Sequence, residues 1–231
     1  MRRKQDRRPT LGGVARDQLR VVEDQALLQL LGYSDEQRLL GEFTGRYGQY
    51  RELDRRILDL AVENTNLKAQ RLAFGPAQEA ANAFRDALKA ATQAAGKEAG
   101  KEDALALTAV TTVREIQVLQ APHIADADEA VMTRMEKEMA TSETAARRAL
   151  DQLRTLLPPS SQGQLKAATA ALDKFVDLNL QIIALSRRNT NVRSLALSLD
   201  EKRKVTTSCE ESLHALQAAL AKRGFTGIRE R

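Results

Sequence analysis

Residues 53–74 read LDRRILDLAVENTNLKAQRLAF, and residues 178–199 read LNLQIIALSRRNTNVRSLALSL. The triplet Asn-Thr-Asn therefore occurs twice, 125 residues apart, each time inside an apolar pattern typical of a helix. Asn and Thr are mediocre helix formers, so helical propensity does not account for this repetition. The two stretches predict two related helices that use the triplet for the same purpose.

The similarity at this offset extends beyond the triplet. Apolar positions upstream of each copy also correspond: Leu40, Phe43, Tyr47, Tyr50, Leu53, Ile57 and Leu60 align with Leu165, Ala168, Leu172, Phe175, Leu178, Ile182 and Leu185. The chain therefore reads as two copies of a helical hairpin, which we assign to residues 10–100 and 101–223.

Breaks in the helical pattern are few. Turn signals at 32–34, 96–101 and 158–161 predict helices over 10–31, 34–95, 102–157 and 161–223. Pro76 and Pro122 fall inside the second and third of these and should kink them. We expect an all-α fold, an up-down-up-down antiparallel four-helix bundle with long helices and a shortened first helix. A disordered basic tail (1–9) and a flexible end (224–231) should flank the helical domain (10–223).

Composition narrows the classes of function. The chain has 231 residues, 42% of them hydrophobic, but no Trp and only 3% aromatics, which suits packed helices better than a site that stacks flat substrates or bases. The net charge of +5 comes mostly from residues 1–8, so we expect no nucleic-acid partner. No apolar run is long enough to cross a membrane. We find no catalytic motif, metal-ligand spacing or cofactor signature, and expect a non-enzymatic protein without a cofactor or metal.

The repeated triplet supplies the main candidate site. Asn64 and Asn189 fall on the apolar stripe of their helices, which we expect to run parallel and diagonally opposite, so that the two amides meet in one layer. Thr65 and Thr190 follow them. Two hypotheses remain open: the amides fix the register of the bundle, or they bind a small polar molecule. His123, next to Pro122, is either a buried polar residue or a further ligand contact.

Two segments carry a resemblance to a known family. IALSRRNTNVRSLALSLDEKRKVTTSCEESLHALQAAL is similar to the last helix of the four-helix-bundle sensory region of bacterial methyl-accepting chemotaxis receptors, and VREIQVLQAPHIADADEAVMTRMEKEMA resembles its partner helix. The resemblance covers residues 105–222 and, more loosely, 34–95. It implies small-molecule sensing and chemotaxis signalling partners. The chain lacks the family's membrane helices and signalling hairpin, so kinase control is not carried over.

The resemblance leaves the compartment open. An excised receptor segment would lie at the periplasmic face of the inner membrane, whereas a free-standing chain that starts naturally at Met1 would be cytoplasmic. The shortened first helix should also leave apolar stripes uncovered on the longer helices, among them Val113, Ile116 and Phe84. We therefore expect a homodimer that covers them. The alternative function is a structural helical adaptor that binds another protein's helices.

Overall fold

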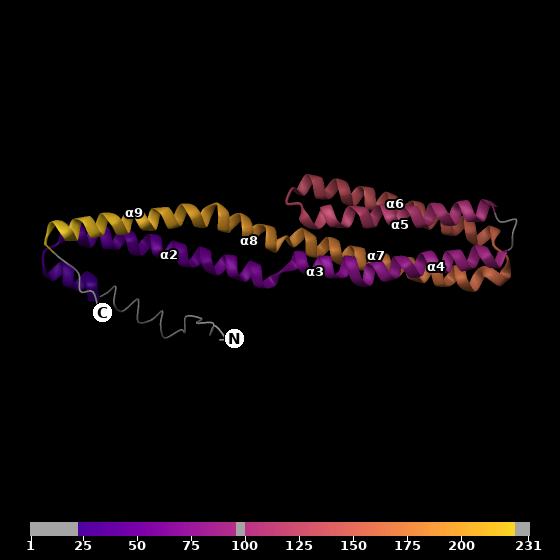
Figure 1. Cartoon of the computed structure of the whole chain (residues 1–231), viewed down its shortest axis with the longest axis horizontal. Coiled ribbons are helices and arrows are strands. Elements are labelled where there is room, and N and C mark those ends of the chain that lie inside the picture. Colours follow the sequence, from indigo (N-terminus) through magenta and orange to yellow (C-terminus); the bar gives the residue numbers. More distant parts are fainter. Residues whose placement is uncertain (1–22, 96–99, 225–231) are drawn as a thin grey trace, which may run out of the picture. The chain divides into compact units, whose positions relative to one another are not determined.

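The computed structural model describes residues 23–95 and 100–224, and within these ranges every regular element is helical (Figure 1). A helical segment at 23–30 precedes α2 (Ser34–Glu63), α3 (Thr65–Leu72), the π-helical turn η1 (Ala73–Ala77), α4 (Gln78–Ala95), α5 (Gly100–Ala125), α6 (Glu129–Leu156), the 3-10 turn η2 (Pro159–Ser161), α7 (Gln162–Arg188), α8 (Thr190–Leu199) and α9 (Glu201–Lys222). The all-α prediction is confirmed. None of the described helices combines the length and apolarity that a bilayer crossing requires.

The chain divides into two compact units, which are described separately. Unit 1 comprises residues 1–58 and 196–231, and unit 2 comprises residues 59–195. In unit 1, α2 lies beside α9 and is joined to it by two ion pairs, Lys202–Asp54 (2.5 Å) and Arg223–Glu36 (3.0 Å). Its core is small: Leu28, Leu40 and Leu216 pack together, flanked by partly buried Tyr33, Leu39, Phe43 and Leu220.

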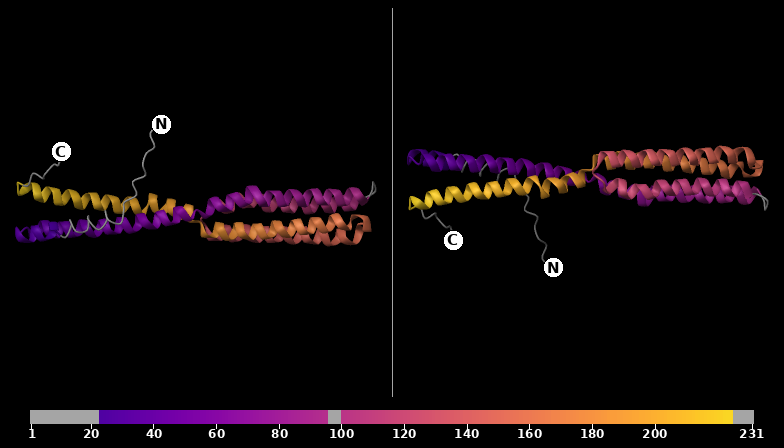
Figure 2. Two further views of the ribbon diagram at one scale, coloured as in Figure 1. Left: turned by 90° about the horizontal axis from the view of Figure 1, so that it is seen from below. Right: turned by 90° about the horizontal axis from the view of Figure 1, so that it is seen from above.

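Unit 2 contains the main hydrophobic core. Here α4 packs along α7, and α5 packs along α6. In addition, α4 contacts α5, and α6 contacts α7 (Figures 1 and 2). The buried side chains come from all of these helices and include Phe84, Val113, Ile116, Leu153, Leu172 and Phe175. Small residues such as Ala69, Ala109, Ala146 and Ala168 are also fully buried, which lets the helix backbones approach closely.

One predicted helix is wrong. Residues 102–157 do not form a single kinked helix, because α5 ends at Ala125 and α6 begins at Glu129 after a three-residue connection. Pro122 stays inside α5. The Asp128 carboxylate caps the start of α6 by accepting from the backbone N–H groups of Ala130 (2.7 Å) and Val131 (3.1 Å). The chain reverses here, and α6 packs back along α5.

This reversal removes the premise of the predicted dimer interface. Val113 and Ile116 are 1% exposed and Phe84 is fully buried, since α5, α6 and α4 bury these side chains within unit 2. These three side chains, which were expected to need a second copy, are therefore covered by the chain itself, whereas Phe74 remains 69% exposed.

The predicted second and fourth helices are also interrupted. The stretch 34–95 is broken at Asn64, and the stretch 161–223 is broken at Asn189 and Asp200. At Gly75-Pro76 the helix is not broken: it widens into the π-helical turn Ala73–Ala77, which accommodates a proline that lacks the N–H. The predicted basic tail, residues 10–22 of the first helix, the tip at 96–99 and the end at 225–231 lie outside the described residues.

Candidate functional site

Both Asn-Thr-Asn triplets interrupt a helix in the same way. Asn64 and Asn189 have left-handed backbones, with φ of 54° and 51°, and they are the only described non-glycine residues with positive φ. Asn tolerates this conformation better than most residues because its short polar side chain can bond locally. Each helix therefore ends at its Asn, and a new helix starts at the following Thr.

The two triplets bond to each other, which answers why the triplet is repeated. The backbone N–H of Thr65 donates to Thr190 Oγ1 (3.0 Å), and the N–H of Thr190 donates to Thr65 Oγ1 (3.2 Å). Asn66 and Asn191 repeat the exchange, each N–H donating to the other's Oδ1 at 3.2 and 3.1 Å. The first N–H groups of a helix have no partner within it, so each triplet caps the helix start of the other.

The side-chain amides complete the symmetry. Asn66 Nδ2 donates to Asn189 Oδ1 (2.8 Å), and Asn191 Nδ2 donates to Asn64 Oδ1 (2.7 Å). The side chains pair as Asn64 with Asn191, Thr65 with Thr190 and Asn66 with Asn189, so the two triplets run in opposite directions. We call these six residues, 64–66 and 189–191, the junction. The two helices meet there as predicted, but they are antiparallel neighbours and not parallel and diagonally opposite.

The structure also corrects which residues lie inside. Asn189 is buried as predicted (6% exposed), whereas Asn64 is only half-buried. Thr65 is fully buried and Thr190 is 2% exposed, although the prediction centred the stripe on the Asn residues. The left-handed residue shifts the phase of the helix, so the stripe that leads to residue 64 continues at 65, 66 and 69. Leu67, three residues after Asn64 and therefore one helical turn along an uninterrupted stripe, is exposed.

Backbone carbonyls at the end of α5 bind the junction on one side. Asn66 Nδ2 also donates to the carbonyl of Ile124, and Asn189 Nδ2 donates to the carbonyl of Asp126, both at 2.6 Å. The amides of Asn66 and Asn189 are thus occupied by protein partners. This geometry favours a structural role for them over direct ligand binding.

His123 directly precedes Ile124, whose carbonyl is one of the two that bind the junction, and it is fully buried. Its Nδ1 lies 2.8 Å from Ser186 Oγ, and its Nε2 lies 2.9 Å from Glu136 Oε1. The Ser186 hydroxyl donates to the carbonyl of His123 (2.6 Å), so it presents lone pairs to Nδ1. A carboxylate also accepts. His123 therefore joins α5 to α6 through Glu136 and to α7 through Ser186.

Arg187 extends this cluster to the surface. Its guanidinium binds both oxygens of Glu136, with Nε at 2.6 Å from Oε1 and Nη2 at 2.9 Å from Oε2, and it also reaches Glu129 (2.5 Å) and Thr133 (2.7 Å). The Arg187 bonds, helped by His123, lower the pKa of Glu136 below its ordinary value against the effect of burial. The carboxylate in turn raises the pKa of Arg187. This cluster ties α6 to α7 beside the end of α5.

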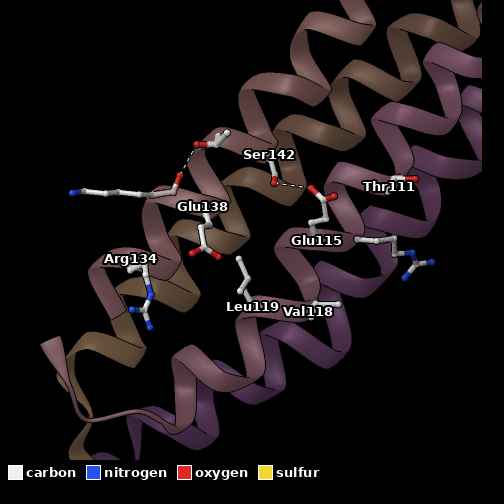
Figure 3. Close-up of a pocket in the computed structure, with 10 residues that line it drawn as sticks. Thr111, Glu115, Val118, Leu119, Arg134, Glu138 and Ser142 are labelled. Carbon is white, nitrogen blue, oxygen red and sulfur yellow. Dashed lines mark hydrogen bonds between the residues drawn. The ribbon is translucent and has the colours of Figure 1, made fainter. Parts of the chain in front are cut away.

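A separate groove of about 690 Å³ lies on the outer side of α5 and α6 (Figure 3). Thr111, Arg114, Glu115, Val118 and Leu119 line it from α5, and Arg134, Lys137, Glu138, Thr141 and Ser142 line it from α6. Its lining has an apolar base and charges of both signs. Within the described residues, no group of three or more His, Cys, Asp or Glu side chains is placed to hold a metal ion.

All five predicted site residues lie at or beside the junction: Asn64, Thr65, Asn189, Thr190 and His123. The prediction missed Asn66 and Asn191, which take part in most of the bonds between the triplets, and it missed Ser186, Glu136 and Arg187. The triplets themselves could have indicated the first two, since all three residues are repeated. No sequence spacing indicated that Glu136 and Arg187 would meet at His123.

No protein-family model, curated protein or solved structure matches the chain.

Proposed function

We propose that the chain is a non-enzymatic signal-sensing module of the chemoreceptor type, which binds a small molecule or relays a conformational signal in bacterial signal transduction. The observation that carries the proposal is the junction. Two helix starts, α3 and α8, are held there by each other's side chains and by carbonyls at the end of α5. A change in one helix of unit 2 therefore reaches both helix starts.

In this proposal unit 2 is an up-down-up-down four-helix bundle formed by α3–α4, α5, α6 and α7. The packing of helices in chain order and the short α5–α6 and α6–α7 connections support that arrangement. A ligand shifts such a bundle only by the difference in its affinity for two states. The junction could supply these two states, one with its hydrogen bonds formed and one with them broken.

The proposal includes a homodimer that passes its signal to chemotaxis partners. The resemblance of the α5–α9 region to receptor sensory helices supports the partner class. The junction and its link to α5 support the relay.

A thermal-shift screen tests the sensing function. The whole chain is heated with a library of small organic acids, amino acids and amines, and a ligand that binds the folded state raises the unfolding temperature by mass action. For each hit, amide hydrogen exchange is then measured with and without the ligand. We expect exchange at residues 64–66 and 189–191 to change. Ligands that stabilise the chain without altering exchange at the junction would contradict the relay.

One observation favours the second candidate, a structural helical adaptor. Helix α5 exposes Leu107 (67%) and Val118 (73%). Exposed apolar side chains on a helix are typical of a surface that a partner's helix covers. Pull-down with the whole chain separates the two functions: an adaptor retains a helical protein partner and shows no response to small molecules.

A further inference from the structure

The end of α5 is bound by two asparagine side chains of the junction. The last carbonyl groups of a helix have no donor within that helix, so their donors must come from elsewhere. The carbonyl of Ile124 accepts from Asn66 Nδ2 at 2.6 Å. The carbonyl of Asp126, just past the last residue of α5, accepts from Asn189 Nδ2 at the same distance. The junction therefore binds the carboxyl end of one helix, in addition to the two helix starts that it caps.

The repeat gives the junction two matching halves. In one half, Asn66 Nδ2 donates to Asn189 Oδ1 (2.8 Å). In the other half, Asn191 Nδ2 donates to Asn64 Oδ1 (2.7 Å). The members of the two halves correspond at the 125-residue offset, and each amide nitrogen carries two hydrogens. Beyond its internal bond, each half can therefore donate to further acceptors through the same groups.

The two halves differ in what they bind. In the half formed by Asn66 and Asn189, both amides donate to the α5 end and both residues are buried. We call this the occupied half. In the half formed by Asn64 and Asn191, which we call the open half, both residues are only half-buried. Within the described parts of the chain, Asn64 Nδ2 donates to no acceptor, and Asn191 Nδ2 donates only to Asn64 Oδ1.

The occupied half indicates which group fits the open half. Its acceptors are two backbone carbonyl oxygens at the carboxyl end of a helix, where the helix carries a partial negative charge. A carboxylate beside the open half would repel such a helix end. The residue before Asn64 is a carboxylate, Glu63, but it forms an ion pair with Arg188, so its charge is compensated.

We propose that the open half binds the carboxyl end of a helix from a partner protein, whose last carbonyls accept from Asn64 and Asn191. The proposal goes beyond small-molecule sensing and does not depend on it. Both halves belong to one network, because the backbone N–H groups and hydroxyls of Thr65 and Thr190 bond each other between them. A helix end bound at the open half therefore stabilises both helix starts.

Matched substitutions to aspartate test whether the two halves differ in occupancy. Aspartate tolerates positive φ and keeps an oxygen that accepts from the neighbouring Asn, but it lacks the amide donor. In the chain alone, Asn189→Asp should lower the urea midpoint, because it sets a carboxylate against the carbonyl of Asp126. Asn64→Asp should lower it much less, since it removes no donated bond. An equal loss in the two variants would overturn the open half, because Asn64 would then already have an acceptor.

A peptide with the α5 end is the binding probe. Residues 110–127 of the chain, acetylated and amidated, are added to the isotope-labelled whole chain, and NMR follows the side-chain amide signals of its Asn residues. We expect the signals of Asn64 and Asn191 to shift with peptide concentration, whereas those of Asn66 and Asn189 stay in place. The control peptide, residues 104–121, has the same length but lacks the α5 end, and it should shift none of them.

The same titration identifies the group that is bound. Asn64→Asp should raise the peptide's dissociation constant about tenfold or more, which corresponds to ~1.4 kcal/mol, because the new carboxylate repels the carbonyls. Gln49→Glu adds the same charge at an exposed position of α2 and should leave the constant unchanged. Circular dichroism verifies that both variants are folded.

Three results would overturn the proposal. The first is a wild-type chain whose Asn64 and Asn191 signals do not respond to the peptide. The second is an equal response to acetate at the same concentration, which would show that the open half takes a free carboxylate instead of a helix end. The third is a shift confined to Asn66 and Asn189, because the peptide would then replace α5 in the occupied half. A ligand found in the thermal-shift screen would support sensing under any of these results.

Discussion

At the scale of single residues, the junction depends on an exchange of capping groups. A helix start normally takes its capping oxygen from the residue just before it. Here that residue is a left-handed Asn whose side chain makes no cap bond to its own helix. The missing acceptors come from Thr and Asn of the other triplet, so each helix start depends on the other helix.

Removing one threonine hydroxyl should therefore affect the opposite helix. Thr190→Val leaves the buried N–H of Thr65 without its acceptor, and Thr65→Val does the same to Thr190. We expect each to lower the free energy of unfolding by about 1–3 kcal/mol, the cost of an unpaired buried donor. Urea denaturation measures it. Thr108→Val, an exposed threonine that bonds only within its own helix, should change the value by less than about 0.5 kcal/mol.

The double variant distinguishes a shared network from two separate caps. The two hydroxyls also bond each other at 3.2 Å, so the effects should not add. We expect the double variant to differ from the sum of the single variants by about 0.5 kcal/mol or more. Strict additivity would contradict the reciprocal arrangement.

The left-handed residues give an ordered series of substitutions. Asn64→Gly should be the mildest, because glycine adopts positive φ freely and only the bond from Asn191 is lost. Asn64→Ala should cost about 1–2 kcal/mol more, through the left-handed backbone alone. Asn189→Gly should exceed Asn64→Gly, since it removes the bonds to Asn66 and to the carbonyl of Asp126. Equal effects of Asn64→Gly and Asn189→Gly on the urea midpoint would show that the buried amide bonds contribute little.

At the scale of helices, the sequence predicted the helical class and the turn at Gly32, where φ is 68°, but not every helix end. The break after Ala125 was missed because proline was taken as the strongest breaker nearby. Pro122 remains helical, and the stop is set by the Asp126–Asp128 connection and the Asp128 cap. Helical periodicity also cannot detect a single left-handed residue, so Asn64 and Asn189 were read as interior positions of continuous helices.

The cluster that ties α6 to α7 should make stability depend on acid. Hydrogen bonds from Arg187 and His123 lower the pKa of Glu136 in the folded chain relative to the unfolded chain. The stabilisation that ionised Glu136 provides is therefore fully present above the ordinary glutamate pKa. It is lost as the pH falls through the lowered pKa of Glu136 in the folded chain. Glu136→Gln should destabilise the chain at neutral pH, and the gap to wild type should narrow in acid.

Urea midpoints measured at neutral pH and in an acid series test this effect. Glu138→Gln is the matched control, since Glu138 lies on the same helix and joins no ion pair among the described residues. The gap between Glu138→Gln and wild type should stay small throughout. A Glu136→Gln gap that is constant with pH would mean that the Arg187 bonds do not favour the ionised carboxylate.

At the scale of the whole molecule, the apolar core is divided unevenly between the two units. Unit 2 buries a continuous cluster of Ala, Leu, Ile, Val, Met and Phe side chains drawn from α3 to α7. Unit 1 buries few apolar side chains among its described residues: Leu28, Leu40, Leu53, Ile57 and Leu216. It leaves Leu30 (85%) and Leu199 (65%) exposed. Burial of apolar surface is the main favourable term in folding, so unit 2 should hold most of the stability.

Native-state hydrogen exchange should reveal this division directly. Amides of α4, α5, α6 and α7 should exchange only through openings whose free energy approaches that of global unfolding, whereas amides in residues 34–58 and in α9 should exchange through smaller openings. Mass spectrometry of peptides from both units, in the same sample, measures the two rates together. Equal protection in residues 34–58 and 78–95 would contradict the division, and it would require a partner surface over the exposed leucines of unit 1.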